Sequence, residues 1–421
     1  EPSATYKEQL DAWDMGIFTN KHYEDVNLTT TVELGSNVKT IWPYMFSHVR
    51  MQNVTTPASV TSIGTGAFSY CYILTEVTVE STVDAINADV FTECSTLSTL
   101  NIPGSIGTIG AFTSLNLTSL NISGHVGTIS ANAFDNNDNM TSFTVTSTGS
   151  IGTIGAYAFE DCDALMVDIQ GSVDKVCAYA FSDCDAITTL SIRAGEVENY
   201  AYEDMDGLIS ATLYGATVGS YVFYDCDNLE TLVIDGGVTF IGNNAFDDCT
   251  KLSSVTFESG SQDLHIGFQD HSSDVGTFYD SPLTYISLDR ELVYVYDDLD
   301  TWDEGIFASP NYNNDEFPVV TVTLGNNVKT ILPWMFSGVR MEKVEIPTSV
   351  TYIGKEAFSY CYILTEVSCR NTTAPTLGEN VFLNDKDKYN NNLTIKVPYV
   401  SGDEYREKWS QYKSKVWATF E

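Results

Sequence analysis

Short runs in which apolar residues alternate with small polar ones recur along this chain about every 22 residues. One run is Leu97-x-x-Leu100-x-Ile102, and it returns as Leu117-x-x-Leu120-x-Ile122. Its alternation and its Val, Ile and Thr content predict a short β-strand. A second run, of the type Val60-x-x-Ile63-Gly64 or Ile151-x-x-Ile154-Gly155, follows a turn and predicts another strand. Each period is therefore a small coil of strands and turns.

A third recurring feature is a Phe that follows a small residue and, in most copies, precedes a Cys by three positions. The copies are Ala67-Phe68…Cys71, Ala158-Phe159…Cys162, Ala180-Phe181…Cys184, Ala245-Phe246…Cys249 and Ala357-Phe358…Cys361, with Val in Val90-Phe91…Cys94 and Val222-Phe223…Cys226. One coil cannot bury its own apolar side, so stacked coils must share a continuous core. We expect the Phe to be the large inward side chain and the Cys a small buried one. The Gly after Ile should permit a tight or positive-φ backbone.

Together these phrases resemble the BspA-like bacterial surface leucine-rich repeats, whose unit is close to L-x-x-L-x-I-P-x-x-V-x-x-I-G-x-x-A-F-x-x-C. The stretch I-P-T-S-V-T-Y-I-G-K-E-A-F-S-Y-C at 346–361 fits this unit almost letter for letter, and the resemblance covers nearly the whole chain. It implies a β-rich solenoid, a right-handed superhelix of short strands and turns with a C-terminal capping helix. It also implies adhesion to a host, matrix or cell-surface macromolecule.

The spacing of the repeats divides the chain into five segments of one continuous solenoid. These are an interrupted repeat at 1–37, a regular array at 38–257, an insertion at 258–327, further repeats at 328–384, and a C-terminal strand and capping helix at 385–421. The stretch from Val38 to Val77 nearly repeats as Val328 to Val367, which indicates a duplicated block.

The insertion begins where the regular spacing breaks, after Phe246. Alternating Val and Tyr in the stretch 292–296 predict a strand or β-hairpin that projects from the solenoid, followed by an acidic, Asn-rich loop. Long loops on a scaffold often carry binding residues, so its aromatic side chains are candidates. These are Tyr294, Tyr296, Trp302, Phe307 and Tyr312. The alternative is that they pack back over the coil.

The C-terminal segment carries a different pattern. Tyr405, Trp409, Tyr412 and Val416 recur at spacings of four, three and four residues, which is the period of an amphipathic helix. We therefore predict a helix over 404–417. A terminal coil exposes an apolar end, and this helix would cover it.

Charge narrows the range of partners. The chain holds 57 acidic and 20 basic residues, for a net charge of −37. A nucleic-acid partner requires clustered Lys and Arg, so nucleic acid is excluded, and an anionic membrane surface is disfavoured for the same reason. No apolar stretch approaches the length of a membrane span, so we expect no membrane insertion by this segment. The charge suits an exported, extracellular or cell-surface monomer.

The repeated Asp and Cys residues are better explained as structural parts of the repeat than as metal sites or disulfides. Acidic residues beside the repeat Cys, such as Asp183 and Asp185, are expected to be turn residues on a solvated edge. The alternative is a row of weak Ca²⁺ sites, since Ca²⁺ binds several hard oxygens. Seven of the nine Cys share one repeat slot, which favours reduced, buried thiols. Neighbours such as Cys71 and Cys94 could still approach to disulfide distance.

No constellation typical of an enzyme is present in the sequence. The five His share no metal-ligand spacing, and Gly64-Thr65-Gly66 lacks the long strand and helix that flank a dinucleotide loop. We therefore expect no catalytic residue, no cofactor and no metal.

The repeats do present a surface, because residues between the inward positions of a strand point outward. In the central coils these residues carry short hydroxyl and amide groups: Thr99, Asn101, Ser119, Asn121, Ser142, Thr144, Thr189, Ser191, Ser254 and Thr256. Thr and Ser also simply suit exposed strands. With the insertion aromatics, they form our candidate binding surface for a protein or glycan ligand. The leading hypothesis is a non-catalytic adhesion protein, and the alternative is a glycan-binding module of a bacterial nutrient-capture system.

Overall fold

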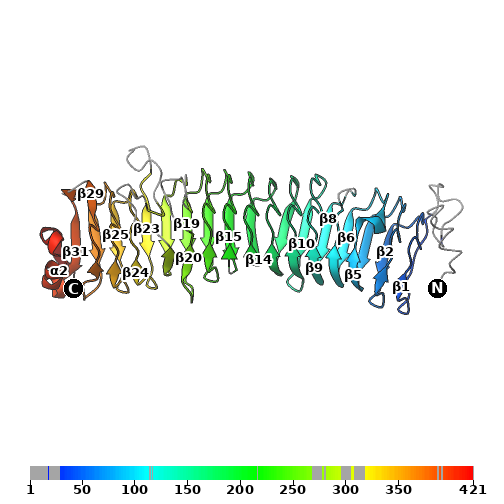
Figure 1. The fold of residues 1–421 in the computed structure, drawn as a ribbon, viewed down its shortest axis with the longest axis horizontal. Helices are drawn as coiled ribbons and strands as arrows, with labels where there is room; N and C mark the ends of the chain where they lie inside the picture. Colours follow the sequence, from blue (N-terminus) through cyan, green and yellow to red (C-terminus); the bar gives the residue numbers. More distant parts are fainter. Residues whose placement is uncertain are drawn as a thin grey trace. The chain divides into compact units, whose positions relative to one another are not determined.

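The chain is a parallel β-solenoid in the computed structural model (Figure 1). The structure describes residues 18, 29–112, 115, 117–215, 217–267, 277–278, 281–294, 305–307, 318–385, 388–389 and 392–420. Two compact units are distinguished by their internal contacts. Unit 1 comprises residues 1–187 and 191–197, and unit 2 comprises 188–190 and 198–421.

Unit 1 has two walls of parallel strands. One wall contains β2 (Asn53–Thr56), β4 (Glu76–Val79), β6 (Thr99–Ile102), β8 (Ser119–Ile122), β10 (Ser142–Val145) and β12 (Met166–Ile169). The other contains β5 (Thr82–Ile86), β7 (Ser105–Ile109), β9 (His125–Ile129), β11 (Ser150–Ile154), β13 (Ser172–Val176) and the last residues of β14 (Thr189–Val197). The short strands β1 (Thr40–Ile41) and β3 (Ser62–Ile63) pair with each other, and η1 (Ala88–Phe91) is a 3-10 turn.

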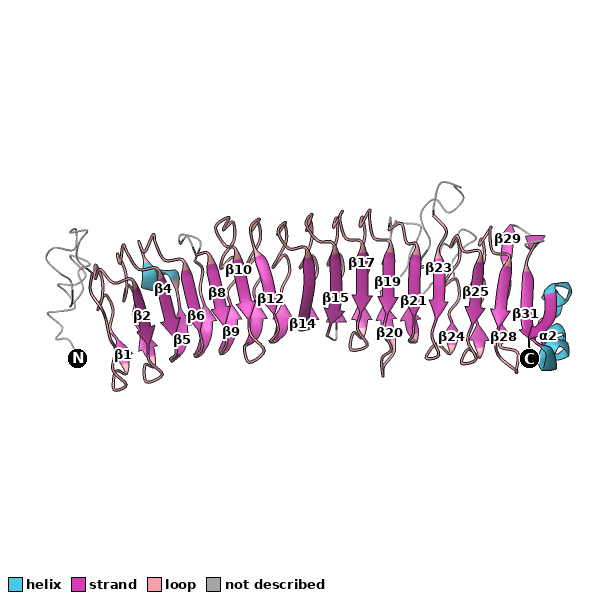
Figure 2. Ribbon diagram, turned by 180° about the vertical axis from the view of Figure 1, so that it is seen from behind, coloured by secondary structure: helices cyan, strands magenta, loops and turns pink. Residues whose placement is uncertain are grey.

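Unit 2 repeats this arrangement (Figure 2). One wall contains β15 (Ser210–Tyr214), β17 (Thr231–Ile234), β19 (Ser254–Phe257), β21 (Tyr285–Leu288) and β23 (Thr321–Leu324), followed by β25 (Lys343–Ile346), β27 (Glu366–Cys369), β31 (Thr394–Pro398) and β32 (Val416–Phe420). The other contains β16 (Thr217–Val218), β18 (Phe240–Ile241), β20 (Leu264–Ile266) and β22 (Leu292–Tyr294), then β24 (Thr330–Ile331), β26 (Tyr352–Ile353) and β28 (Thr376–Leu377). A small antiparallel pair joins β29 (Leu383–Asp385) and β30 (Lys388–Tyr389).

The repeating Phe forms the third side of each coil. In unit 1, neighbouring rings of this series have centroids 5.1–6.3 Å apart. The series is Phe18, Phe46, Phe68, Phe91, Phe112, Phe134, Phe159 and Phe181. In unit 2 the corresponding centroids are 5.3–5.7 Å apart, in the series Tyr202, Phe223, Phe246, Phe278, Phe307, Phe336, Phe358 and Phe382. These separations are those of favourable offset aromatic pairs. The prediction that the Phe fills the core is confirmed.

The turns that carry the Phe require unusual backbone conformations. The residues two before and two after the Phe have positive φ in most coils, for example Tyr157 and Asp161 around Phe159. Asp and Asn tolerate this left-handed region better than most residues. This accounts for the Asp that precedes the repeat Cys: Asp161, Asp183, Asp225 and Asp248 have φ of 57° or 58°. Asp204, which precedes Met205 in the same slot, has φ of 54°.

The Gly that follows Ile serves close approach and not positive φ, which corrects one part of the expectation. A Cβ on Gly242 would lie 2.5 Å from the Ser220 nitrogen, and one on Gly155 would lie 2.5 Å from the Ala131 nitrogen. Neither Gly has φ in the left-handed region. Main-chain atoms of the preceding coil therefore occupy the space that any side chain would need.

The predicted β-hairpin is wrong for the described part of the insertion. Strand β22 pairs in parallel with β20, and β21 pairs in parallel with β19 and β23, so these strands belong to the solenoid walls. Phe278 and Phe307 continue the ring stack, with spacings of about 30 residues in place of about 22. The insertion thus contains widened coils. The residues at 295–304 and 308–317 lie outside the described ranges.

A buried arginine holds one widened coil together. The Arg290 side chain is 1% exposed and donates to the main-chain oxygens of Asp235 and Gln262, at 3.2 and 2.9 Å. Burial lowers the pKa of its guanidinium, because the charged form loses hydration. The two carbonyl contacts partly replace that hydration and link neighbouring coils.

The helix of the C-terminal cap is shorter than predicted. Helix α2 spans Gly402–Lys408, after the 3-10 turn η3 (Tyr399–Ser401), and is followed by the 3-10 segment η4 (Ser410–Lys415). Val416 then begins β32, which pairs in parallel with β31. The predicted stripe is nevertheless buried: Tyr405, Trp409, Tyr412 and Val416 are each at most 5% exposed. They cover the last Phe, because Tyr412 packs edge-on against Phe382 at 5.1 Å.

Among the described residues, no helix is both long and apolar enough to cross a membrane.

Candidate functional site

The outward face of the first wall in unit 1 carries two straight rows of small polar side chains. In one row Thr99, Ser119 and Ser142 are paired across β6, β8 and β10, and in the other Asn101, Asn121 and Thr144 are paired. All six are half-buried, while the residues between them are buried in the core. The parallel register therefore places hydroxyl and amide groups from successive repeats next to one another on neighbouring strands.

Side-chain hydrogen bonds between neighbouring strands hold the polar groups of this face in place. The Asn121 Nδ2 donates to Asn101 Oδ1 at 2.9 Å, and Asn101 Nδ2 donates to Glu76 Oε1 at 2.7 Å. The side chains of Ser142 and Thr144 lie 3.5 Å apart. The rows end at Met166, which is 62% exposed, and Asp168. A partner would meet a flat surface with fixed donors and acceptors and little protruding bulk.

The corresponding face of unit 2 is more varied. Ser254 and Thr256 on β19 are half-buried and face outward, as predicted from their strand positions. Their neighbours in register are Tyr285 and Ser287 on β21. On β14, Thr189 of unit 2 and Ser191 of unit 1 are both exposed. Each candidate strand residue is thus accessible at least in part.

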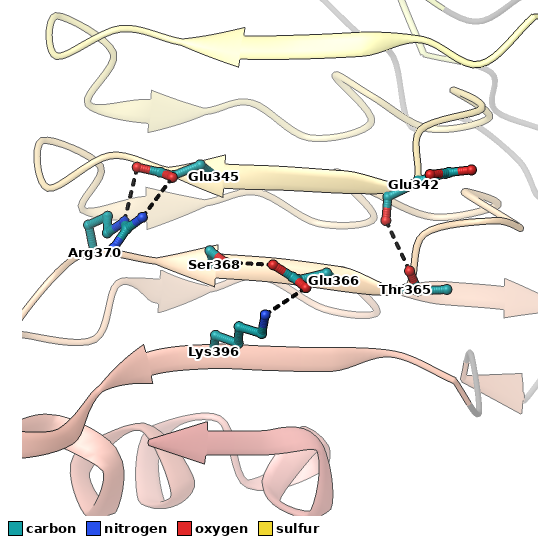
Figure 3. Close-up of polar contacts among 7 residues, drawn as sticks. All are labelled: Glu342, Glu345, Thr365, Glu366, Ser368, Arg370 and Lys396. Atoms are coloured by element: carbon teal, nitrogen blue, oxygen red, sulfur yellow. Dashed lines mark hydrogen bonds and ion pairs between the residues drawn. The ribbon is translucent and has the colours of Figure 1, made fainter. Parts of the chain in front are cut away.

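Toward the C-terminus the same face becomes charged (Figure 3). Arg370 Nε and Nη2 donate to the two carboxylate oxygens of Glu345, at 3.0 and 3.1 Å. Lys396 on β31 donates to Glu366 on β27 at 2.8 Å, which lowers the pKa of the Glu366 carboxyl. Opposite charges alternate from strand to strand and cancel locally, so this region presents no single-sign patch.

Of the insertion aromatics, Tyr294 and Phe307 lie within the described residues. Phe307 is 2% exposed and belongs to the core ring stack, so it is not a surface residue. Tyr294 is 9% exposed, and its hydroxyl donates to the Pro333 main-chain oxygen. Tyr294 is therefore a core residue and is removed from the candidate surface, because the alternation in 292–294 reflects a wall strand. Tyr296, Trp302 and Tyr312 lie outside the described residues and stay predictions.

The repeat Cys contact the main chain of the preceding coil. The thiols of Cys94, Cys184 and Cys361 donate to the main-chain oxygens of Phe68, Phe159 and Phe336, at 3.0–3.1 Å. None of the nine Cys forms a disulfide, and the seven in the repeat slot are buried, as expected for that slot. Burial raises the pKa of the Cys162 thiol to about 12, so it stays protonated at neutral pH.

Three acidic residues on the outer edge of unit 1 are close enough to share a cation. Carboxylate oxygens of Asp163, Asp183 and Asp185 lie within 4.8 Å of one another, and all three side chains are exposed. Burial and the charges of Asp161, Asp185 and Asp138 raise the pKa of Asp163. Like charges at this distance repel, and solvent screens them.

One further feature, a polar cavity in unit 2 beside α2, was not predicted from the sequence. It lies between the turns that follow β25 and β27. Its lining residues belong to three separate segments and follow no periodic pattern. The local signal was the run N-T-T-A-P-T at 371–376, which departs from the usual repeat turn.

Comparison with known proteins agrees with the repeat pattern. The family model described as BspA type leucine rich repeat region, in six copies, matches residues 16–141, 110–218, 216–299 and 312–403. No curated protein sequence matches the chain. A leucine-rich repeat protein from Bacteroides ovatus is 19% identical over 91% of this chain and 87% of its own, with a TM-score of 0.43. A leucine rich cell surface protein from Faecalibacterium prausnitzii is 19% identical over 91% and 89%, with a TM-score of 0.28. With the family model spanning most of its length, the chain belongs to the BspA-type leucine-rich repeat family.

Proposed function

We propose that this chain is a non-catalytic interaction protein, exported to the cell surface or exterior, which binds a macromolecule along an outward strand face. The observation that carries this proposal is the pair of polar rows on β6, β8 and β10 in unit 1. A rigid, flat array of short donors and acceptors suits an extended partner, since solenoids offer area in place of a deep pocket.

Side-chain size supports the same assignment. The rows consist of Ser, Thr and Asn, which lose little conformational entropy when a partner covers them. The amides are also held in place, as the contact between Asn121 and Asn101 shows. Preorganised polar groups lower the cost of binding. The partner class we favour is a host, matrix or cell-surface protein, as the family resemblance implies.

Binding to immobilised matrix and cell-surface proteins, and to whole cells, tests this proposal. We would compare the wild type with a Thr99→Lys, Ser119→Lys double variant, whose long charged side chains break the flat surface. The matched control is Thr108→Lys, Thr128→Lys, because these residues are half-buried outward positions on β7 and β9 of the other wall. We expect the first variant to lose at least 10-fold in affinity, about 1.4 kcal/mol, and the control to bind normally.

Two results would contradict the proposal. Equal losses in both double variants would show that the face of β6 and β8 has no special role. Saturable binding to no protein and to no cell type would remove the adhesion role itself.

A further inference from the structure

The polar cavity beside α2 has a volume of about 380 Å³. This is within the range of small-molecule sites and sufficient for one sugar ring. Thr348 and Thr351 line one side, from the turn after β25, and Thr372 and Thr373 line another, from the turn after β27. Lys408, at the end of α2, closes it. The cavity is therefore built by two coils and the cap together.

Asn371 is the buried polar residue of the lining. Its side chain is 6% exposed, and its Nδ2 donates to the main-chain oxygens of Thr348 and Val350, at 3.0 and 2.7 Å. These two contacts establish which end of the amide is the nitrogen. The Oδ1 has no hydrogen-bond partner among the described residues. A buried acceptor without a donor costs about 1–3 kcal/mol, so an occupant with a hydroxyl group is favoured.

Two cationic side chains also line this cavity. The guanidinium of Arg370 is held from outside by Glu345 (Figure 3), and Lys408 is held by Glu404 at 2.8 Å. Neither carboxylate is part of the lining. Glu345 and Glu404 offset much of the charge of these two cations. The lining itself contains no acidic side chain, so a negatively charged group meets less repulsion here than elsewhere on a chain with 57 acidic residues.

The lining also excludes other ligand classes. It contains no aromatic side chain on which a base could stack, and Val350, Ala374 and Pro375 are its apolar members. A simple anion such as phosphate could meet the cations and donate one hydrogen bond, but it is too small to contact the Thr hydroxyls on both sides of the cavity at the same time. Threonine hydroxyls both donate and accept, which matches a polyhydroxylated ligand.

We propose that this cavity binds an acidic sugar residue, with its carboxylate on the side of Arg370 and Lys408 and a ring hydroxyl toward Asn371. This site is separate from the strand face in unit 1 and does not depend on the function proposed above. It gives the glycan-binding alternative a location that the sequence did not indicate.

Titration calorimetry with methyl β-glucuronide tests the assignment on the whole chain, with methyl β-glucoside and inorganic phosphate as comparison ligands. We expect glucuronide to bind with a Kd of about 1 mM, and glucoside at least 10-fold more weakly. Thr373→Phe should fill the cavity and abolish binding, since Thr373 is exposed and its replacement disturbs no core residue. The control Thr323→Phe changes an exposed outward residue of β23 and should bind normally.

A second set of variants tests whether the ligand must carry a negative charge. Arg370→Gln and Lys408→Gln should each weaken glucuronide binding about 10-fold and leave glucoside binding unchanged, while Arg406→Gln, outside the lining, should change neither. Absence of glucuronide binding, or binding that survives Thr373→Phe, overturns the site. Equal affinity for glucoside, or phosphate that binds as tightly as glucuronide, overturns the acidic sugar as its ligand.

Discussion

The thiol of Cys249 donates a hydrogen bond to the main-chain oxygen of Phe223, one coil earlier, with 3.2 Å between sulfur and oxygen. The same contact recurs in both copies of the duplicated block, from Cys71 to Phe46 and from Cys361 to Phe336. The repeat Cys therefore joins its coil to the main chain of the preceding one. Because the acceptor is a main-chain oxygen, the contact accounts for a small donor in the Cys slot and is also made where Tyr202 replaces the Phe.

Replacing Cys249 by Ala should destabilise the chain, because it removes this donor and leaves a small cavity. We expect a loss of about 1–3 kcal/mol in the free energy of unfolding, measured by urea denaturation. Cys177 lies outside the repeat slot and is only half-buried, so Cys177→Ala is the matched control. Equal effects of the two substitutions would show that the slot has no special role.

Burial of the repeat thiols should also make the free energy of unfolding decrease with rising pH in the alkaline range. The pKa of Cys162 is raised by burial from 9.0 to about 12, so the folded chain keeps a proton that the unfolded chain releases. Its contribution is complete below pH 9 and is lost as the pH rises toward 12. The measurement is the difference in the free energy of unfolding between wild type and Cys162→Ala, by urea denaturation at pH 8, 9, 10 and 11. The difference isolates the thiol, because Tyr residues that titrate in this range affect both proteins alike. The advantage of the wild type should fall by about 1.4 kcal/mol per pH unit above pH 9, and a constant difference would disprove the linkage.

The Gly at the end of the second strand phrase should tolerate no side chain. In Gly242→Ala the new Cβ would lie 2.5 Å from the Ser220 nitrogen and 2.6 Å from the Gly219 carbonyl carbon. Main-chain atoms of a packed coil cannot move aside, so we expect a loss of about 2–3 kcal/mol. Gly35 has no atom within 4 Å of a Cβ position, and Gly35→Ala should change stability by less than about 0.5 kcal/mol. Thermal unfolding of the two variants distinguishes them, and similar midpoints would refute the close-approach explanation.

Arg290 should matter more for stability than an exposed arginine. Arg290→Met leaves the main-chain oxygens of Asp235 and Gln262 without their donor, and we expect a loss of about 2–4 kcal/mol. Arg370→Gln breaks an ion pair with the Arg370 side chain 46% exposed, so it should cost at most about 1 kcal/mol. Denaturation in urea compares them. A smaller effect at Arg290 than at Arg370 would mean that the widened coil does not depend on its buried arginine.

Repetition is what made the fold readable from sequence. Each coil solves the same packing problem, so Phe159 and Phe223 recur in one slot and Cys162 and Cys226 in another. The burial of these residues and the outward position of Thr99 or Ser254 follow from periodicity alone. Where the period changed, as between Phe246 and Phe278, the pattern could not distinguish a widened coil from an excursion, because both begin with the same irregular spacing.

By itself, the sequence determined the solenoid, its core residues, the capping stripe and the absence of clustered positive charge, because all of these depend on residue type and spacing along the chain. Only the tertiary structure decided that Tyr294 is buried, that the Gly serves close approach, and that Asn371, Arg370 and Lys408 line one cavity. Those features depend on contacts between residues from different coils. The contacts of Tyr294 and of the cavity residues are each made once, so no repeat reveals them. The Gly contact does recur, but the repeat shows only that Gly is present and not which atoms of the preceding coil exclude a side chain.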